Sequence, residues 1–345
     1  MKDRRTRTRP RSSARPTQRD IADAAGVSQA TVSMVLTKVE TPSVPQSTRQ
    51  RILKLAGQVG YQPNHPARNL RSAKTMTLAC VIPDITNPFY PGLVRGLQRT
   101  AAPAGYDVLI YDTDGVPEGE RRAIEWLLQG RADGVVGTFF HMRVPDLAAL
   151  SRHGIPLVRL ESQNKSKGNL PIDSVYIDNA GAAAAMTQFL IERGHRQISM
   201  IRGAFGPGER RALGYANVMR EAGLTPEFVI ADAYSEEAGA NAMRRLLAKT
   251  RNRTTAVFGA SDVLALGAME AARADGITVP SDIAIVGFDD IPAAKLLGLT
   301  TVRQPEFQLG TLAARVLIER LKPGGMIPPG QSLELKFEII TRTSA

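Results

Sequence analysis

The chain has 345 residues, of which 43% are hydrophobic and 22% charged, so it is long enough for two or three domains with sizeable cores. It contains no run approaching the ~20 apolar residues of a membrane-spanning helix, and the polar stretch after its basic N-terminus excludes a secretory signal. A single cysteine, Cys80, excludes an intrachain disulfide framework and a cysteine-based metal site, so we expect a cytoplasmic protein.

Charge is divided unevenly along the chain. Residues 1–75 hold fifteen Lys and Arg against four Asp and Glu, which is the whole net charge of +11, whereas residues 76–345 hold 29 of each sign. Clustered cations gain affinity for DNA by displacing condensed counterions from its phosphates. The asymmetry predicts a polyanion-binding head on a neutral body. Residues 1–16 are too polar to form a core, so a disordered, merely solvated basic tail is the alternative for that segment.

The first predicted helix begins at a capping box. Thr17 and Asp20 have the spacing at which a hydroxyl and a carboxylate each accept from the other residue's backbone N–H. Gly26 offers a turn, and Ser28 can cap a second helix. The apolar residues spaced to bury the angle between these helices are Ile21, Ala22, Val27, Val32 and Val35. This pattern predicts a helix-turn-helix, with a generic helical hairpin as the alternative.

In a helix-turn-helix, the exposed N-terminal part of the second helix enters the major groove of DNA. Gln29 can pair with adenine there, and Ala30 and Met34 can touch thymine methyl groups. The candidate DNA contacts of this region are Thr17, Ser28, Gln29, Ala30, Thr31, Ser33 and Met34.

A third helix is predicted over residues 47–59, and its apolar face closes a small core. The residues on that face are Ile52, Leu55, Ala56 and Val59. After it, the string Pro63-Asn64-His65-Pro66-Ala67-Arg68-Asn69-Leu70-Arg71 is basic and has no core of its own. Alone it should be disordered, because helices below ~12 residues are marginal in water.

The strings TQRDIADAAGVSQATVSMVL, from Thr17, and YQPNHPARNLRS, from Tyr61, resemble the headpiece and hinge of the LacI/GalR family of transcription regulators. The resemblance implies that residues 63–75 fold into a hinge helix on the operator, pair with the same segment of a second copy and push Leu70 between base pairs in the minor groove. The other DNA contacts implied in this segment are Asn64, Ala67 and Arg68. Met34 replaces a polar base reader typical of the family, so the operator sequence does not carry over.

From residue 76 onward, short apolar segments alternate with helical stretches. Strands are predicted at residues 78–82, 107–111, 134–137, 157–160, 198–201, 256–258 and 283–288. Apolar strands between helices indicate mainly parallel sheets covered on both faces, in two lobes. The resemblance extends over nearly the whole chain. It implies a likeness to periplasmic sugar-binding proteins, with strands crossing between the lobes near residues 161–176, around 289–304 and near the C-terminus.

The predicted fold is therefore an N-terminal all-α helix-turn-helix headpiece with a hinge helix, followed by a two-lobed α/β domain like a periplasmic binding protein. The predicted domains are a basic tail (1–16), the headpiece (17–62), the hinge (63–75) and a ligand-binding and dimerisation domain (76–345).

Open parallel sheets bind ligands beyond the carboxyl ends of their strands, and the residues that follow the predicted strands are polar. By resemblance, the effector-contacting positions are Phe89, Glu161, Arg211, Tyr234, Ser261 and Asp289. Carboxylates can accept from sugar hydroxyls, Arg211 can donate, and an aromatic ring can stack on a sugar. For each of these residues, a helix cap or a satisfied turn group is the alternative. Asp84 and Asp262 are interpreted as structural.

No catalytic residue, metal ligand or cofactor is predicted. Asp289 and Asp290 are adjacent at a strand end and point to opposite sides, so one is expected to face the cleft and the other to cap. The string GAFGPG at residues 203–208 lacks the dinucleotide and phosphate-loop fingerprints and is interpreted as a loop. The four histidines show no ligand spacing.

Together these patterns predict a homodimeric transcription regulator, most often a repressor in this family. Its expected partners are double-stranded, pseudo-palindromic operator DNA and a small hydroxylated effector, a sugar or sugar derivative, with no membrane. A purine, a nucleoside or a protein partner remains an alternative effector. A stand-alone sugar-binding or sugar-processing protein is the alternative of a different class, but it has no use for Arg68 and Leu70 at this place.

Overall fold

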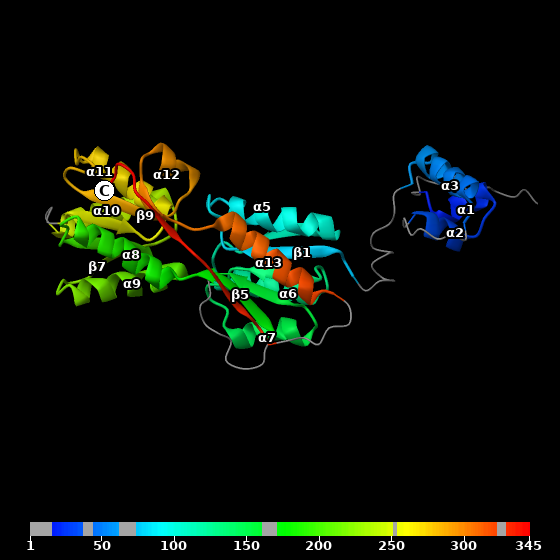
Figure 1. Cartoon of the computed structure of the whole chain (residues 1–345), viewed down its shortest axis with the longest axis horizontal. Coiled ribbons are helices and arrows are strands. Elements are labelled where there is room, and N and C mark those ends of the chain that lie inside the picture. The colour runs from blue at the N-terminus through cyan, green and yellow to red at the C-terminus, as the bar shows by residue number, and fades with distance from the viewer. Residues whose placement is uncertain (1–15, 37–43, 62–73, 161–170, 251–253, 323–328) are drawn as a thin grey trace, which may run out of the picture. The chain divides into compact units, whose positions relative to one another are not determined.

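The computed structural model describes residues 16–36, 44–61, 74–160, 171–250, 254–322 and 329–345. The chain divides into two compact units, Met1–Lys74 and Thr75–Ala345 (Figure 1). Residues 63–73 of the predicted hinge lie outside the described residues, and with them Asn64, Ala67, Arg68 and Leu70. Glu161 lies outside them as well.

The first unit contains the helices α1 (Gln18–Ala25), α2 (Gln29–Leu36) and α3 (Gln46–Gln58). All three contribute to one core, whose buried residues are Ile21, Ala22, Ala25, Val32, Val35, Ile52 and Ala56. The prediction for Val59 is wrong, because α3 ends at Gln58 and leaves the Val59 side chain 44% exposed. Leu55 and Tyr61 pack against the core instead.

The second unit has two lobes, each built on a six-stranded sheet. The first-lobe strands are β1 (Thr77–Ile82), β2 (Asp107–Asp112), β3 (Gly134–Gly137), β4 (Leu157–Leu160), β5 (Ile172–Ile177) and β11 (Ser332–Leu335), in the order β11-β5-β4-β3-β1-β2. All of these strands pair in parallel. The first-lobe helices are α5 (Tyr90–Ala101), η1 (Ala102–Ala104), α6 (Pro117–Leu128), α7 (Val144–Arg152) and α13 (Glu306–Arg320).

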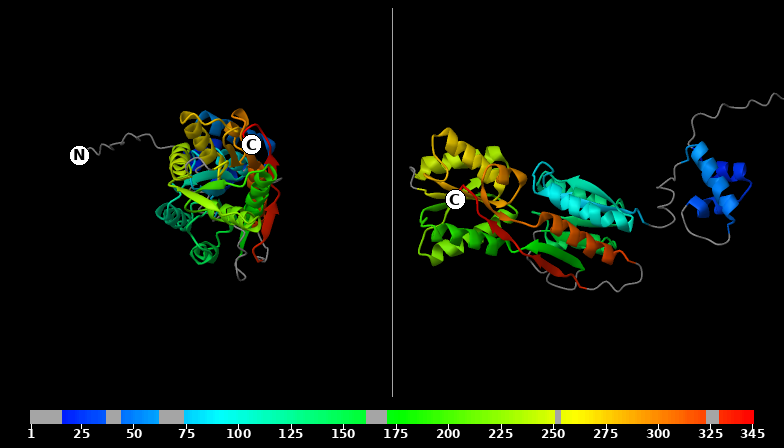
Figure 2. Two further views of the ribbon diagram at one scale, coloured as in Figure 1. Left: turned by 90° about the vertical axis from the view of Figure 1, so that its left-hand side faces the viewer. Right: turned by 45° about the horizontal axis from the view of Figure 1, so that its top comes forward.

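Strand β1 explains why this sheet needs helices on both faces. Its residues alternate between two apolar clusters, and both sets are fully buried. Leu78, Cys80 and Ile82 pack in the cluster that contains residues of α5 and α13, whereas Ala79 and Val81 pack in the cluster of α6 and α7. Helices α5 and α13, far apart in the sequence, lie side by side (Figure 2).

The second lobe repeats the plan around one continuous apolar cluster. Its strands are β6 (Ile198–Gly203), β7 (Glu227–Ala231), β8 (Ala256–Gly259), β9 (Ala284–Asp289), β10 (Thr300–Arg303) and β12 (Glu338–Ile340), in the order β12-β10-β9-β8-β6-β7. Only the edge strand β12 runs antiparallel, against β10. The helices are α8 (Asn179–Glu192), α9 (Pro207–Glu221), α10 (Glu236–Thr250), α11 (Asp262–Ala274) and α12 (Pro292–Leu296).

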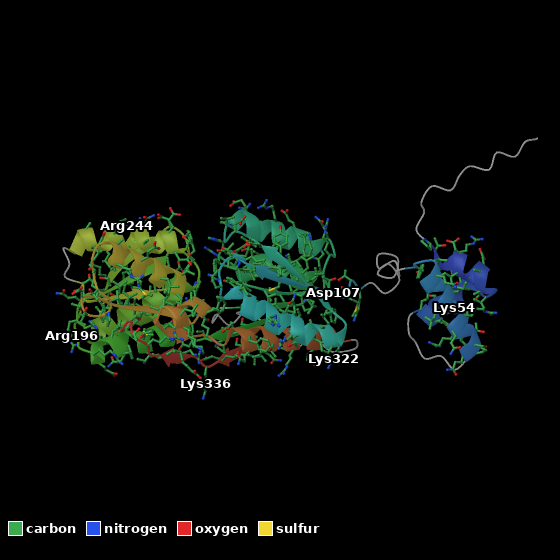
Figure 3. The ribbon with its side chains drawn as sticks, turned by 90° about the horizontal axis from the view of Figure 1, so that it is seen from above. Lys54, Asp107, Arg196, Arg244, Lys322 and Lys336 are labelled. Atoms are coloured by element: carbon green, nitrogen blue, oxygen red, sulfur yellow. The ribbon has the colours of Figure 1, made fainter. Side chains whose placement is uncertain are left out.

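The chain crosses between the lobes in three places. The crossings follow β5, β10 and β11, and Lys336 marks the third (Figure 3). The first crossing lies at Asp178, later than predicted, because residues 172–177 form β5, which pairs with β4 and β11 in the first-lobe sheet. The segment near the C-terminus forms two short strands in different sheets. No described helix combines the length and the apolar character needed to span a membrane.

Candidate functional site

Two caps fix the geometry of α1 and α2. The Thr17 N–H donates to Asp20 Oδ2 at 2.9 Å, and the Asp20 N–H donates to Thr17 Oγ1 at 3.3 Å, so the predicted capping box is present. Gly26 ends α1 with φ +64°, in the left-handed region that favours glycine. The Ser28 hydroxyl accepts from the Thr31 N–H at 3.1 Å at the start of α2. This is the helix-turn-helix arrangement.

The N-terminal part of α2 presents polar and small side chains to solvent. Ser28, Gln29 and Ala30 are exposed, whereas Val32 and Val35 on the opposite face are buried. The other candidate DNA contacts of this helix, Thr31, Ser33 and Met34, are half-buried. The hydroxyls of Ser28 and Thr31 lie 2.8 Å apart, and the Thr17 hydroxyl bonds Asp20 at 2.8 Å. Contacts of these three hydroxyls with DNA would therefore be made in addition to their capping bonds.

The described part of the head also carries exposed cations. Arg19 on α1 and Arg51 and Lys54 on α3 are exposed, and Figure 3 labels Lys54. Guanidinium and ammonium groups on long side chains suit phosphate oxygens.

A second candidate site is a cleft of about 470 Å³ lined by residues of both lobes. Of the predicted effector contacts, Phe89, Arg211, Tyr234, Ser261 and Asp289 all line this one cleft. They lie in the segments that follow β1, β6, β7 and β8, and Asp289 ends β9, as expected for open parallel sheets.

Arg211 is held in a fixed place at the bottom of this site. It is 1% exposed although it sits in the second turn of α9. Its Nε donates to Asn179 Oδ1 at 2.8 Å, and its Nη1 donates to the Ala260 carbonyl at 2.6 Å and lies 3.5 Å from Asp289 Oδ1. The guanidinium carbon lies 3.6 Å from the centre of the Phe288 ring. A cation so buried must be paired, and its rigid fork suits hydroxylated ligands.

Asp289 ends β9 in an uncommon backbone conformation. Its φ is +127°, and that of Asp290 is +62°, in the region that L-residues rarely adopt. The Asp289 side chain is 6% exposed and its Oδ1 accepts from Gln304 Nε2 at 2.6 Å. The carboxylate lies beside Arg211, with its Oδ1 3.5 Å from Arg211 Nη1.

Asp262 bonds to residues on either side of this turn. Its Oδ2 accepts from the Ile291 N–H at 2.9 Å and its Oδ1 accepts from the Thr301 hydroxyl at 2.5 Å. Burial, and then the neighbouring Asp289, raise the pKa of Asp262 to about 7. These bonds support the interpretation of Asp262 as a structural residue.

The other predicted residues have local partners too. The Ser261 hydroxyl is the N-cap of α11 and accepts from the Leu264 N–H at 3.4 Å, so the capping alternative applies to it. The Tyr234 hydroxyl accepts from the Gly208 N–H at 3.1 Å and donates to the Phe205 carbonyl at 3.2 Å. Phe89 is buried with its ring edge-to-face on Tyr90.

Asp290 does not cap a helix, which corrects the prediction for the residue paired with Asp289. It accepts from Arg303 Nε at 2.7 Å and from Arg342 Nη2 at 2.5 Å. The N-cap of α12 is Ile291 instead. Charge-assisted bonds to two guanidinium groups next to a crossing segment are stronger than the bond of a helix cap. Within the described ranges, no three His, Cys, Asp or Glu side chains gather in a way that could hold a metal ion.

Sequence reasoning missed the aromatic side chains Phe140 and Phe205 that line the cleft. They lie in the loops that follow β3 and β6. The rule that ligands bind beyond strand ends could have found both, because both strands were predicted.

Comparison with known proteins covers both candidate sites. The profile described as "Bacterial regulatory proteins, lacI family" matches residues 17–64, and the profile "Periplasmic binding protein-like domain" matches residues 187–345. The first match spans the three helices of the head, and the second spans most of the second lobe.

Relatives match over almost the full chain. The HTH-type transcriptional repressor CytR of Escherichia coli (strain K12) is 34% identical over 338 residues, covering 95% of this chain and 96% of the relative. The ribose operon repressor of Halalkalibacterium halodurans is 36% identical over 310 residues, covering 89% and 90%. Among solved structures, a complex of the transcriptional regulator CelR with cellobiose is 30% identical, covers 96% of this chain and all of that chain, and superimposes with a TM-score of 0.68.

Proposed function

The chain belongs to the lacI family of bacterial regulatory proteins, and from this premise we propose that it is a dimeric repressor of transcription whose affinity for operator DNA is set by a small ligand between its lobes. The head supplies DNA recognition. The exposed N-terminal residues of α2 suit the major groove, and the flanking cations suit phosphates.

The proposed base contacts are Gln29, Ala30 and Met34, and the remaining outward residues position the helix. Residues 63–75 are proposed to form the hinge, with Leu70 as the wedge and with Asn64, Ala67 and Arg68 beside it. A symmetric dimer would read a pseudo-palindromic operator, because two equal heads meet two equal half-sites.

The buried pair of Arg211 and Asp289 is the single observation that carries the effector proposal. A donor fork and a carboxylate side by side in one cleft match adjacent hydroxyl groups, which both donate and accept. Aromatic side chains, including Phe89 and Tyr234, can cover the apolar face of a sugar ring. Glu161 is proposed as a further contact. Two relatives bear on the choice of ligand, one named for the ribose operon and one solved with cellobiose.

The same aromatic lining also suits a nucleoside, which adds a planar base to a hydroxylated sugar. This second candidate differs from the first in size and in apolar area, so one screen separates them.

The proposed mechanism couples two equilibria. Ligand that binds better to one arrangement of the lobes shifts the population toward it and thereby gathers or spreads the paired hinge segments. Because linkage is reciprocal, a ligand that weakens DNA binding must bind less tightly to the operator complex, by a factor set by ~1–3 kcal/mol.

A thermal-shift screen of sugars, polyols and nucleosides tests the effector proposal. A compound that binds only the folded protein raises the melting temperature, by an amount that grows with its concentration over Kd. Asp289→Asn should lose the shift, whereas Asp232→Asn should keep it, because Asp232 also lines the cleft but its side chain is 84% exposed. A compound that stabilises wild type and Asp289→Asn equally would overturn the assignment.

A further inference from the structure

Two loops, one from each lobe, meet at the cleft. Residues 138–142 follow β3 in the first lobe, and residues 204–206 join β6 to α9 in the second. The rings of His141 and Phe205 lie edge-to-face with their centroids 4.9 Å apart. Phe205 keeps 57% of its surface exposed, so this contact lies at the solvent edge of the cleft.

A second contact joins the same loops. The ring of Phe140 lies directly over Gly206, where a Cβ atom would come within 2.8 Å of two ring carbons. Gly206 has φ +72° and ψ −142°, a conformation that is nearly specific to glycine. The absence of a side chain at Gly206 in the GAFGPG string therefore lets the Phe140 ring approach the backbone of the other lobe. A generic loop has no need of a glycine at this position.

A buried carboxylate shapes the first-lobe loop. Glu120 on α6 is fully buried and accepts from three consecutive backbone N–H groups, those of Phe140 at 2.7 Å, His141 at 3.1 Å and Met142 at 2.9 Å. Bonds of backbone donors to an ionised acceptor are strong, and they fix the direction of the loop. Phe140 and His141 point at the other lobe because Glu120 holds their backbone.

Both halves of the contact are also tied to the lining of the cleft. His141 Nε2 lies 3.0 Å from the carbonyl oxygen of Gly115, which lines the cleft. The Phe205 carbonyl accepts from the hydroxyl of Tyr234, a proposed ligand contact. A movement of either loop therefore changes the wall of the site.

We propose that Phe140 and His141 of the first lobe, with Phe205 and Gly206 of the second, form an aromatic gate that controls access to the cleft, and that Glu120 is its positioning residue. The gate admits and releases ligand when the two loops separate. Its use by an effector rests on the proposed function, but its opening does not require an effector.

A thiol reporter inside the cleft measures that opening without any effector. Ser261 lines the cleft and is 1% exposed, so Ser261→Cys places a thiol behind the gate by replacing a single oxygen atom with sulfur. The native Cys80 is fully buried, and burial raises its pKa to about 12, so it contributes little thiolate and little background reaction. The probe is the aryl disulfide dithiodipyridine, whose reaction is followed by absorbance.

In full-length Ser261→Cys protein, adding Phe205→Ala or His141→Ala should accelerate labelling by about two- to tenfold, the worth of one aromatic pair. Leu213→Ala is the matched control, because Leu213 is 46% exposed on α9 of the same lobe and does not line the cleft. Its labelling rate should stay that of the parent. An unchanged rate in Phe205→Ala, or a parent rate equal to that of a free small thiol, would overturn the gate.

Hydrogen exchange tests the part of Glu120. Glu120→Gln keeps the volume but replaces one acceptor by a donor, so the N–H groups of Phe140, His141 and Met142 should exchange roughly ten- to a hundredfold faster. If Glu120 acts through the gate, Phe205→Ala should add no further acceleration of labelling in the Glu120→Gln background. Two effects that multiply would show that Glu120 is only structural.

Failure of these experiments and failure of the effector proposal can be told apart. The labelling and exchange rates are measured without ligand, so they remain valid evidence on the gate even if no compound in the thermal-shift screen binds. Equally, unchanged labelling in Phe205→Ala removes the gate and leaves a thermal shift that depends on Asp289 intact.

Discussion

The head and the two-lobed unit solve recognition in opposite ways. In the head, the candidate contacts Gln29 and Ala30 are exposed, and residues 1–75 carry the whole net charge of +11. In the two-lobed unit, Arg211 and Asp289 are at most 6% exposed, and the surrounding charges balance. The head should therefore act through long-range forces that salt screens, and the cleft through short, desolvated bonds that depend on single atoms.

The largest expected effect is the salt dependence of DNA binding. Each phosphate contact contributes about 0.9 to the slope of log affinity against log salt, so six contacts would cost roughly a thousandfold between about 50 and 200 mM salt. Ligand binding in the cleft should change by less than about threefold over the same range, because buried pairs are screened little. Fluorescence anisotropy for DNA and calorimetry for ligand give the two slopes. Equal slopes would show that salt screens the cleft as strongly as it screens the head.

Leu70→Ala should come next in size. Loss of the wedge should weaken specific operator binding by about a few kcal/mol and leave non-specific DNA binding and the fold nearly unchanged. Leu53→Ala is the control, because Leu53 is a 49% exposed leucine of the head outside the hinge string. Anisotropy titrations with operator and with random DNA measure both affinities. Equal specific affinities of the two variants would remove Leu70 from the interface.

Asp262 should give the stability of the two-lobed unit a pH dependence. Its folded pKa of about 7 lies above the ordinary value of 3.8, so the folded state binds the extra proton in this window. Its contribution to stability is therefore full below about pH 4 and is lost as the pH rises through about 7. In urea unfolding of the two-lobed unit, the free energy of unfolding should decrease less with pH in Asp262→Asn than in wild type. The difference should be on the order of a few kcal/mol. A slope identical to that of wild type would show that Asp262 does not titrate there.

Thr17→Ala should have the smallest effect, and it should be confined to the head. Removal of an N-cap hydroxyl costs about 1 kcal/mol of local stability. Hydrogen exchange should become faster in α1 and stay unchanged in the sheets of both lobes. Thr17→Ser keeps the hydroxyl and should behave as wild type. Faster exchange in β1 or β9 would mean that the two units do not unfold independently.

The sequence predicts the head well because its bonds are local. Thr17 and Asp20 are three residues apart, and the apolar faces of three short helices follow from their spacing. Val59 marks the limit, since a periodic pattern cannot tell that the helix has ended one residue earlier.

Two strands that the apolar pattern does not predict, β5 and β10, depend on distant partners. Strand β5 carries the buried residues Asp173 and Ser174, which break an apolar pattern. Asp173 is tolerated there because Arg320 binds it with two bonds of 2.8 Å, across 147 residues of sequence. Strand β10 is similar, since buried Thr301 bonds Asp262. No pattern of neighbouring residues in the sequence predicts such distant partners.

The contacts of the cleft also differ in how far they can be predicted from the sequence. Arg211 and Asp289 follow from the resemblance and from their places near strand ends, and they do line one cleft. The contact of His141 with Phe205 depends on how the two lobes face each other, which no spacing within either lobe encodes. Tertiary contacts between separately folded sheets are therefore what the sequence leaves open.

Control of the head's DNA affinity by ligand in the cleft can be measured by an anisotropy titration of the operator complex with the compound found by thermal-shift screening, for wild type, Arg211→Ala and Asp289→Ala. Loss of one buried donor or acceptor should shift the ligand concentration for half response by about ten- to a hundredfold. Both variants should bind operator nearly normally in the absence of ligand and should not respond at the ligand concentration at which wild type responds. A response of both variants at that concentration would rule out control through Arg211 and Asp289.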